Sequence, residues 1–391
     1  MGGLVRGRVP AGDAMSPGCV RPFVLPCLKG PRPVRLVRTA TSVLSVTALL
    51  LTLGACGSND AAPSGPAGGD PNARAATLRL GYFANVTHAS AVYGVASGDF
   101  QRSLGDTRLE PSVFNAGPAA IEALRGGAID ATFIGPNPAI NGYTQTDGEL
   151  LRIVAGTTSG GASLVVKPDI TDVKQLEGKR IATPQLGNTQ DVAAKAYFAD
   201  QGVTVDVVNQ ENAQTLDLFT AGDIDGGWVP EPWASRLVME GGGTRLVDEA
   251  SLWPQGQFVT TQLVVSQQFL TEYPGSVQDL LTGLVAATGK AVTKTPEVQA
   301  TVNTQIEADT GRALSPEILA AAFERLTPTL DPIAESLKKS AADATAVGIT
   351  PTEPDLQGIY DLRPLNALLA AAGRPEVSDG GLGVTTTPGS S

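Results

Sequence analysis

The sequence predicts an α/β protein with two lobes, each a mainly parallel sheet flanked by helices. Short apolar strands alternate with helical patterns from Thr77 to Ser266, and this alternation is typical of parallel sheets. The length of 391 residues exceeds that of one ordinary domain. A motif that runs from a glycine through Ile-Asp into an apolar strand occurs at 127–136 and again at 222–231. Two lobes built on one plan would produce this repeat, and chance similarity between Gly-rich strand–helix units is the alternative.

The expected strands are short apolar runs separated by helical patterns. In chain order they are Leu78–Phe83, Leu109–Asn115, Ile129–Gly135, Leu151–Thr157, Ser163–Lys167, Arg180–Thr183, Val203–Asn209, Ile224–Val229, Arg245–Asp248 and Thr261–Ser266. Proline suits a first helical position and glycine suits the residue after a helix, so these two residue types mark the helix limits. The positions concerned are Pro118 for a start and Gly127, Gly202, Gly222 and Gly241 for ends.

The part of the chain after Ser266 has an almost wholly helical pattern as far as about Val347. Ser315-Pro316 and Asp331-Pro332 are typical of a helix cap followed by proline. Residues 376–391 are rich in Gly, Thr and Ser, and we expect this end of the segment 348–391 to be disordered.

The composition supports a large folded body and excludes several functions. Hydrophobic residues make up 42% of the chain and charged residues 17%, which allows a substantial core. The net charge of −11 argues against a nucleic-acid partner, because phosphate contacts need a basic surface. One His and three Cys argue against zinc or iron–sulfur chemistry, so we expect no metal and no cofactor.

The charge is unevenly distributed along the chain. Seven Lys and Arg and one Asp precede Cys56, whereas 21 Lys and Arg and 38 Asp and Glu follow it. A basic head before an acidic body is typical of an export signal. The apolar stretch Val43–Leu53 measures about 16 Å as a helix, which is too short to cross a bilayer core of roughly 30 Å.

The apolar stretch ends in Leu-Gly-Ala-Cys, which resembles a bacterial lipobox with Cys56 as the lipidated residue. Residues 1–55 are then a lipoprotein signal peptide, and the small polar residues up to 76 form a flexible tether, 56–76. The mature protein would be held by its lipid at the extracytoplasmic face of the cell membrane, with no second Cys for a disulfide. The alternative is a chance match that follows an ordinary signal peptide.

Four turns at the expected carboxyl ends of strands are candidates for a ligand site. In open parallel sheets, ligands bind where such loops lead into helices. A helix start offers free N–H groups and about half a positive charge, so it can hold an anion without Lys or Arg. The alternative is ordinary capping, with Asn188 or Thr189 bonded to its own helix. The turns are 82–88, 115–118, 135–138 and 183–190.

Two other features are candidates for binding. Trp228 and Trp233 enclose the rigid sequence Pro-Glu231-Pro, so a tryptophan can wall a pocket and Glu231 can accept an N–H or cationic group of a ligand. The alternatives are that Trp228 fills a core and that Glu231 is solvated. His88, the single histidine, can donate to a ligand or serve only as a helix cap. Catalysis by His88 is not expected, because no second base or nucleophile recurs beside it.

These motifs together resemble the solute-binding proteins of ABC transporters, in the aliphatic sulfonate, taurine and nitrate family, some of whose members bind thiamine pyrimidine precursors. The resemblance covers residues 77–345. It is carried by the lipobox and by LRLGYF (78–83), FNAGPAAIEALRGGAID (114–130), IGPNPAI (134–140), ATPQLGNTQDVA (182–193) and DGGWVPEPW (225–233). The turn Pro-Asn137-Pro departs from the Ser or Asp that sulfonate-type members more often carry there, which leaves the ligand class open.

The resemblance implies the two-lobed periplasmic-binding-protein fold of type II, with two crossover segments near 166–168 and 264–268. Lobe one would comprise 77–165 plus 268–347, and lobe two 169–263. The ligand would lie in the cleft between the lobes. The family's cleft positions map onto Phe83, His88, Asn115, Gly117, Asn137, Asn188, Thr189, Trp228 and Glu231.

Three functions follow from the resemblance and the residues. The first is capture of a small sulfonate, nitrate or nitrogen-containing solute by a monomer that delivers it to an ABC permease and its ATPase. The second is a pyrimidine-precursor-processing enzyme on the same fold, which would need a reactive group in the cleft. The third is a sensory binding protein that docks on a receptor.

Overall fold

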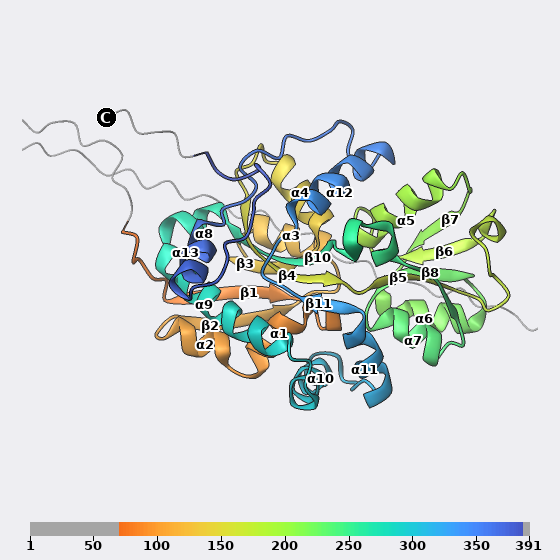
Figure 1. Cartoon of the computed structure of the whole chain (residues 1–391), viewed down its shortest axis with the longest axis horizontal. Helices are drawn as coiled ribbons and strands as arrows, with labels where there is room; N and C mark the ends of the chain where they lie inside the picture. Colours follow the sequence, from red (N-terminus) through yellow and green to blue (C-terminus); the bar gives the residue numbers. More distant parts are fainter. Residues whose placement is uncertain (1–69, 386–391) are drawn as a thin grey trace, which may run out of the picture. The chain divides into compact units, whose positions relative to one another are not determined.

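The computed structural model describes residues 70–385, and it contains two β-sheets flanked by helices (Figure 1). The expected α/β class is confirmed. The expected signal peptide 1–55, Cys56, the tether as far as residue 69 and residues 386–391 lie outside the described residues. Among residues 70–385, no helix combines the length and the apolar character that a membrane crossing requires.

The first sheet, called sheet A, has the strand order β11-β4-β10-β3-β1-β2. Its strands are β1 (Thr77–Tyr82), β2 (Arg108–Val113), β3 (Ala131–Ile134), β4 (Leu151–Gly160), β10 (Val259–Ser266) and β11 (Leu326–Pro328). The second sheet, called sheet B, has the order β7-β6-β8-β5-β9. Its strands are β5 (Ala162–Val166), β6 (Arg180–Thr183), β7 (Asp206–Asn209), β8 (Gly226–Pro230) and β9 (Thr244–Asp248). The ten expected strands are all present, and the short edge strand β11 is an addition.

The two sheets have the same plan. Five strands in the order β2-β1-β3-β10-β4 correspond to β7-β6-β8-β5-β9, with the same directions at every pairing. The motif repeated at 127–136 and 222–231 leads into β3 and β8, which occupy equivalent places. The repeat in the sequence therefore reflects two halves of one design.

Four strands of each sheet run in one direction, as expected for mainly parallel sheets, but neither sheet is wholly parallel. The pairs β1–β2, β1–β3, β6–β7 and β6–β8 are parallel, whereas β5 and β10 run antiparallel to both of their neighbours. Each of these two strands is the first that the chain forms after passing from one sheet to the other. Strand–helix alternation predicts direction only for strands joined by a crossover within one sheet.

An aspartate performs the same task at the start of β3 and of β8. Asp130 Oδ2 accepts from the backbone N–H of Arg79 at 2.8 Å, and Asp225 Oδ2 accepts from that of Arg180 at 2.9 Å. The Asp130 carbonyl accepts from Ser266 N, and the Asp225 carbonyl accepts from Lys167 N, each at 2.9 Å. Each aspartate thus joins three neighbouring strands, which explains the Ile-Asp element of the repeat.

The chain passes between the sheets at Gly161, between β4 and β5, and through residues 249–258, between β9 and β10. The crossover segments expected near 166–168 and 264–268 were therefore misplaced, since Val166 and Val264 lie inside strands. Gly160 and Gly161 both have positive φ, of 80° and 81°, which favours glycine and lets the chain turn sharply between strands. The limits of the two lobes remain a prediction.

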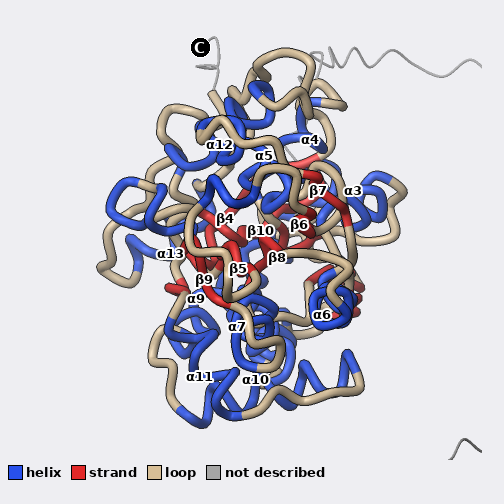
Figure 2. Tube along the Cα trace, turned by 90° about the vertical axis from the view of Figure 1, so that its right-hand side faces the viewer, coloured by secondary structure: helices blue, strands red, loops and turns tan. Residues whose placement is uncertain are grey.

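Helices cover both faces of each sheet, and the strands lie between them (Figure 2). One face of sheet A packs against α1 (Ala89–Ala96), α2 (Asp99–Leu104), α8 (Gln267–Glu272), α9 (Pro274–Ala291), α10 (Pro296–Thr310), α11 (Pro316–Glu324) and α13 (Arg363–Ala371). Its other face packs against α3 (Gly117–Arg125), α4 (Pro136–Thr144) and α12 (Ala334–Ala346). Sheet B lies between α5 (Thr189–Asp200) and the pair α6 (Asn212–Ala221) and α7 (Trp233–Met239).

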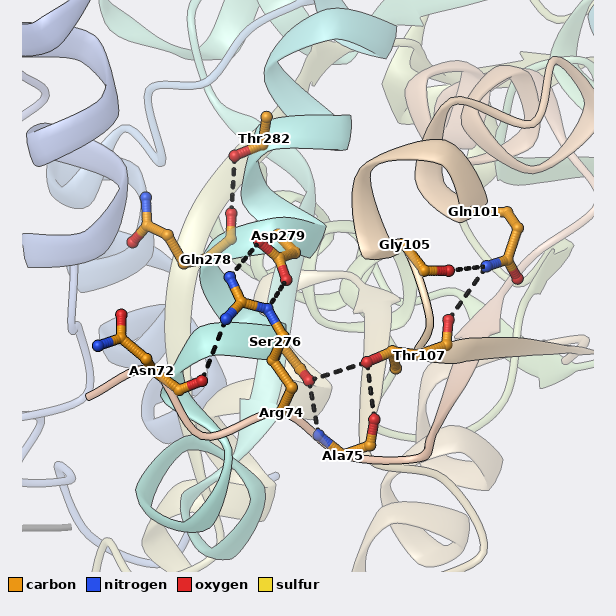
Figure 3. Close-up of polar contacts among 10 residues, drawn as sticks. All are labelled: Asn72, Arg74, Ala75, Gln101, Gly105, Thr107, Ser276, Gln278, Asp279 and Thr282. Atoms are coloured by element: carbon orange, nitrogen blue, oxygen red, sulfur yellow. Dashed lines mark hydrogen bonds and ion pairs between the residues drawn. The ribbon is translucent and has the colours of Figure 1, made fainter. Parts of the chain in front are cut away.

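Residues 70–76, expected as the end of the tether, are bonded to the folded body (Figure 3). Arg74 Nε donates to Asp279 Oδ2 of α9 at 2.6 Å, and Ala75 N donates to Ser276 Oγ at 2.9 Å. Thr107 Oγ1 donates to the Ala75 carbonyl at 2.7 Å. This part of the tether prediction was wrong, because a polar composition does not prevent backbone groups from bonding to a neighbouring helix.

Residues 376–385 are also packed against the body, so the expected disorder is contradicted for this stretch. Asn366 of α13 exchanges two hydrogen bonds with the backbone of Val377, at 2.9 and 3.0 Å. Gly383 forms a β-bridge with Tyr360, which in turn bridges Ile153 of β4. Backbone pairing at these two places holds a segment whose side chains are small and polar.

The second passage between the sheets contains a buried carboxyl group. Glu249 lies in the 3-10 turn η3 (Glu249–Leu252), is 1% exposed, and accepts from Trp228 Nε1 at 2.7 Å. Burial raises the pKa of Glu249 to about 7. The folded state therefore favours the protonated carboxyl, and the stability that Glu249 contributes is present at acidic pH and lost as pH rises to about 7.

Replacing Glu249 should remove this pH dependence. We expect the free energy of unfolding of the natural protein, relative to Glu249→Gln, to fall by about 2–3 kcal/mol between pH 4 and pH 8. Denaturant unfolding at a series of pH values measures the difference. Glu272→Gln, which changes an exposed glutamate on α8, is the matched control and should leave the pH profile unaltered. Parallel profiles for the natural protein and Glu249→Gln would contradict the assignment.

Candidate functional site

Two adjoining cavities lie where the carboxyl ends of strands from both sheets meet. The small cavity has a volume of about 20 Å³ and the large one about 420 Å³. The small cavity is lined by Phe83, Asn85, Thr87, His88, Asn115, Gly135, Asn188, Thr189, Gln190, Asn212, Pro230 and Thr260. Most of these residues follow β1, β2, β3, β6 or β7, and Pro230 is the last residue of β8, as expected for open α/β sheets. Phe83, Asn85, Asn115 and Asn212 line both cavities.

The amino-terminal end of α5 contributes the strongest polar feature of the small cavity. Asn188 is the N-cap residue, but its side chain makes no capping hydrogen bond, so the ordinary capping interpretation is not what the structure shows. Thr189 is 4% exposed, and within residues 70–385 its hydroxyl has no hydrogen-bond partner. Free N–H groups, the helix dipole and an unused hydroxyl therefore converge on one place.

Gly135 brings α5 close to sheet A. A Cβ atom at Gly135 would lie 2.2 Å from Thr189 Oγ1, so any larger residue would push the two apart. Gly117 has a related role between α3 and α4, since its Cβ would lie 2.2 Å from Pro138 Cγ. That position would also be 3.3 Å from Asn188 Oδ1. Gly117 thus stands beside the site and allows close packing behind it, although it does not line the small cavity.

His88 is held as a neutral donor. Its Nδ1 accepts from the backbone N–H of Phe83 at 3.3 Å, and its ring stacks on that of Phe83 with centroids 4.3 Å apart. Burial lowers the pKa of His88 to about 3. With Nδ1 occupied as an acceptor, the neutral ring carries its proton on Nε2, which makes Nε2–H the donor available at the cavity wall.

Amide groups complete the donor set. Thr87 Oγ1 donates to Asn85 Oδ1 at 2.7 Å, which orients the Asn85 amide and leaves its NH₂ group as a donor. Asn115 Nδ2 lies 3.4 Å from Glu211 Oε1, so this contact joins a loop of sheet A to a loop of sheet B. None of the residues that line the small cavity carries a formal charge in this state, and its polarity comes from amides, hydroxyls and a helix end.

Five of the nine expected ligand-binding residues line the small cavity, namely Phe83, His88, Asn115, Asn188 and Thr189. Asn137 does not line either cavity, because its amide donates to the Ser340 carbonyl of α12 at 3.0 Å. The Pro-Asn-Pro turn thus fastens α4 to α12.

Trp228 and Glu231 also lie away from both cavity walls. Trp228 is fully buried in the core of sheet B, where its indole N–H bonds to Glu249, so the core interpretation holds. Glu231 is fully buried, pairs with Arg245 at 3.0 Å, and accepts from Ser235 N at 3.0 Å. Its carboxylate is neither solvated nor offered to a ligand, and it stabilises the start of α7.

Several lining residues were not named from the sequence. Asn85, Thr87 and Gln190 belong to turns that were recognised, but nothing distinguished them from their neighbours. Asn212 follows β7, so the rule about carboxyl ends of strands applied to it as well. Thr260 lies near the start of β10, and it reaches the site only because β10 runs antiparallel to β3.

The volume of the small cavity limits the size of a solute that can enter it. A volume of about 20 Å³ holds roughly one water molecule. A larger solute therefore needs the loops of the two sheets to separate. The polar contacts that join these loops are Asn115–Glu211, Arg312–Glu240 at 3.9 Å and Arg325–Asp248 at 3.1 Å. Arg312 is largely exposed and Arg325 about half exposed, so these ion pairs contribute little to holding the loops together.

Comparisons with known proteins give two curated relatives whose names describe binding proteins. It is 27% identical over 168 residues to the taurine-binding periplasmic protein of Escherichia coli (strain K12). That match covers 42% of this chain and 52% of the relative, so the chain spans about half the length of the curated relative. The chain is also 20% identical over 256 residues to a protein of Brucella abortus (strain 2308) whose name describes a binding protein. That match covers 62% of this chain and 78% of the relative.

Solved structures show the same fold. The alkanesulfonate-binding protein SsuA from Xanthomonas axonopodis pv. citri bound to MOPS superposes with a TM-score of 0.62 and 22% identity, over 72% of this chain and 96% of that one. The nitrate-binding protein NrtA from Synechocystis PCC 6803 gives 0.66 and 15%, over 77% and 90%. The model of the NMT1-like family matches residues 71–305, which include every residue that lines the small cavity. The chain belongs to the NMT1-like family.

Proposed function

We propose that the protein is the solute-binding component of an ABC importer, which captures a small sulfonate, nitrate or nitrogen-containing solute and delivers it to a permease. The observation that carries the proposal is the small cavity between the strand ends of both sheets, lined by uncharged donors and by the unused hydroxyl of Thr189. The names of the taurine-, alkanesulfonate- and nitrate-binding relatives support the same solute class.

The donor set suits an oxyanion. A sulfonate or nitrate spreads its charge over several oxygens, each of which accepts hydrogen bonds. His88 Nε2, the Asn85 and Asn188 amides, Thr189 Oγ1 and the first N–H groups of α5 supply donors from both sheets. Because the donors are neutral, the solute keeps a net charge that the helix dipole and oriented amides offset.

Binding would also select a conformation. The donors of sheet A and of sheet B can contact one oxyanion together only when the loops lie close to each other, in a closed form whose small cavity is larger than the volume of about 20 Å³ in this structure. A solute that bonds to both therefore binds the closed form more tightly than the open form and shifts the population toward it. We propose that the permease recognises this closed form. We also propose that the two sheets correspond to the two lobes.

The remaining parts of the proposal rest on the sequence. Lipidation at Cys56 would hold the protein at the extracytoplasmic face of the membrane, and the protein would act as a monomer. We propose no catalytic role, because His88 has one nitrogen bonded to Phe83 and stays neutral, and the small cavity has no Cys or Lys among its lining residues. Chemical change of a bound solute by the purified protein would favour the enzyme hypothesis instead.

The hydroxyl of Thr189 offers a direct test. Thr189→Val preserves the shape of the side chain and removes a buried hydroxyl that has no partner, so the stability of the free protein should stay the same or rise. The affinity for an oxyanion should fall about tenfold to a hundredfold. Thermal shift and calorimetry with taurine, methanesulfonate and nitrate measure both quantities.

Thr220→Val is the matched control, since Thr220 is an exposed helical threonine on α6 outside both cavities. It should leave the affinity unchanged. If Thr189→Val and Asn188→Ala both bind the solute as tightly as the natural protein, the proposed site is wrong.

The single histidine makes a second test specific. Because burial lowers the pKa of His88 from 6.5 to about 3, the stability that the neutral ring contributes is present above pH 6.5 and is lost as pH falls toward 3. We expect the natural protein to lose about 2 kcal/mol between pH 7 and pH 5 relative to His88→Gln. Solute affinity of the natural protein should stay constant over the same range. An imidazole NMR signal that titrates near pH 6.5 would refute the buried neutral ring.

A further inference from the structure

The large cavity has the size and walls of an organic-ligand site. Its volume of about 420 Å³ falls in the range typical of small-molecule pockets, roughly 300–1,000 Å³. Aromatic rings of Phe83, Phe114 and Trp233 form part of its wall. It is bordered by the loops after β1 and β2, by the starts of α6 and α7, and by the end of α10. A cavity of this size beside the oxyanion donors exceeds what taurine or nitrate needs.

Carboxylates outnumber guanidinium groups around the large cavity. Its charged lining residues are Glu211, Asp217, Glu240, Asp309, Arg236 and Arg312. Both arginines contact Glu240, at 2.9 and 3.9 Å, and Arg236 also lies over the Trp233 ring. In the described part of the chain, no Lys or Arg lies within 4.0 Å of the other three carboxylates. The cavity therefore disfavours a second anion.

The carboxylates and one buried acceptor atom at the large cavity can accept hydrogen bonds from a ligand. Asp309 accepts from Tyr82 Oη at 2.7 Å and from Gln305 Nε2 at 2.8 Å, which fixes its position at the wall. Asn212 Oδ1 is a buried atom with no hydrogen-bond partner in residues 70–385, and Asn212 lines both cavities. Glu211 precedes it and contacts Asn115, another residue of both cavities. Acceptors thus begin at the junction with the oxyanion donors and continue into the large cavity.

We propose that the solute is a zwitterion larger than taurine, with an oxyanion head in the small cavity and a cationic nitrogen on an apolar or ring-bearing segment in the large one. This inference rests on the proposed function and adds the second half of the ligand. Asn212 Oδ1 and the carboxylates of Glu211 and Asp217 accept from or offset the charged nitrogen, and the aromatic walls cover the apolar segment. Neutral donors at one end and carboxylates at the other fix the direction in which the solute lies.

Two matched probes test the cationic part. One is cyclohexylamino-propanesulfonate, whose nitrogen is cationic at pH 7, and the other is cyclohexylbutanesulfonate, in which a methylene replaces the NH₂⁺ group. Calorimetry on the full-length protein should show that the cationic probe binds about tenfold more tightly than its isostere. In the double variant Glu211→Gln, Asp217→Asn this preference should fall to about twofold or less, with the isostere unaffected.

Asp169→Asn, which removes an exposed carboxylate outside both cavities, is the control and should leave the preference intact. Equal affinity for the two probes, or an equal effect of the double variant on both, would overturn the inference and leave the proposed function standing. Binding of taurine or nitrate without binding of either probe would do the same, because it would exclude a larger solute. If none of these four compounds binds, the proposed function fails and the inference fails with it.

Discussion

The arrangement of both sheets depends on the hydrogen bonds of two equivalent aspartates, Asp130 at the start of β3 and Asp225 at the start of β8. One residue bonds to two neighbouring strands, through its carboxylate on one side and its carbonyl on the other, so the register of three strands is set at their common edge. The opposite edge then carries the carboxyl ends of β1, β3, β6 and β8. Because both sheets repeat this contact, their loops meet as two similar edges, and the two cavities lie there.

The two cavities at these loops differ in their chemistry. The small cavity concentrates donors without formal charge, so the proposed oxyanion would gain hydrogen bonds and the potential of a helix end without a buried Lys or Arg to desolvate. The large cavity has aromatic walls and an excess of carboxylates. The ion pairs that join the loops of the two sheets are exposed and weak, and under the proposed function a solute that bonds to both sides would stabilise the closed arrangement.

The candidate site residues of the sequence fall into two groups in the structure: some line the small cavity, and others are bonded within the protein. Thr189 and His88 lie at helix starts with free polar groups at a cavity wall. Trp228, Glu231 and Asn137 are equally distinctive in the sequence, yet their side chains are hydrogen-bonded within the protein. Their partners are Glu249, Arg245 and the Ser340 carbonyl, respectively. A buried polar group needs a partner, and the partners here come from segments far away in the chain. No local pattern identifies such a partner.

The sequence by itself determined where strands and helices form, that the body has two similar halves, and which turns lie at strand ends, because these depend on local periodicity and on glycine and proline. Tertiary structure alone decided the direction of β5 and β10, the positions at which the chain changes sheets, and the ordering of residues 70–76 and 376–385. It also decided which polar side chains stay free for a solute. Those outcomes depend on contacts between residues distant in sequence, and local propensity does not encode such contacts.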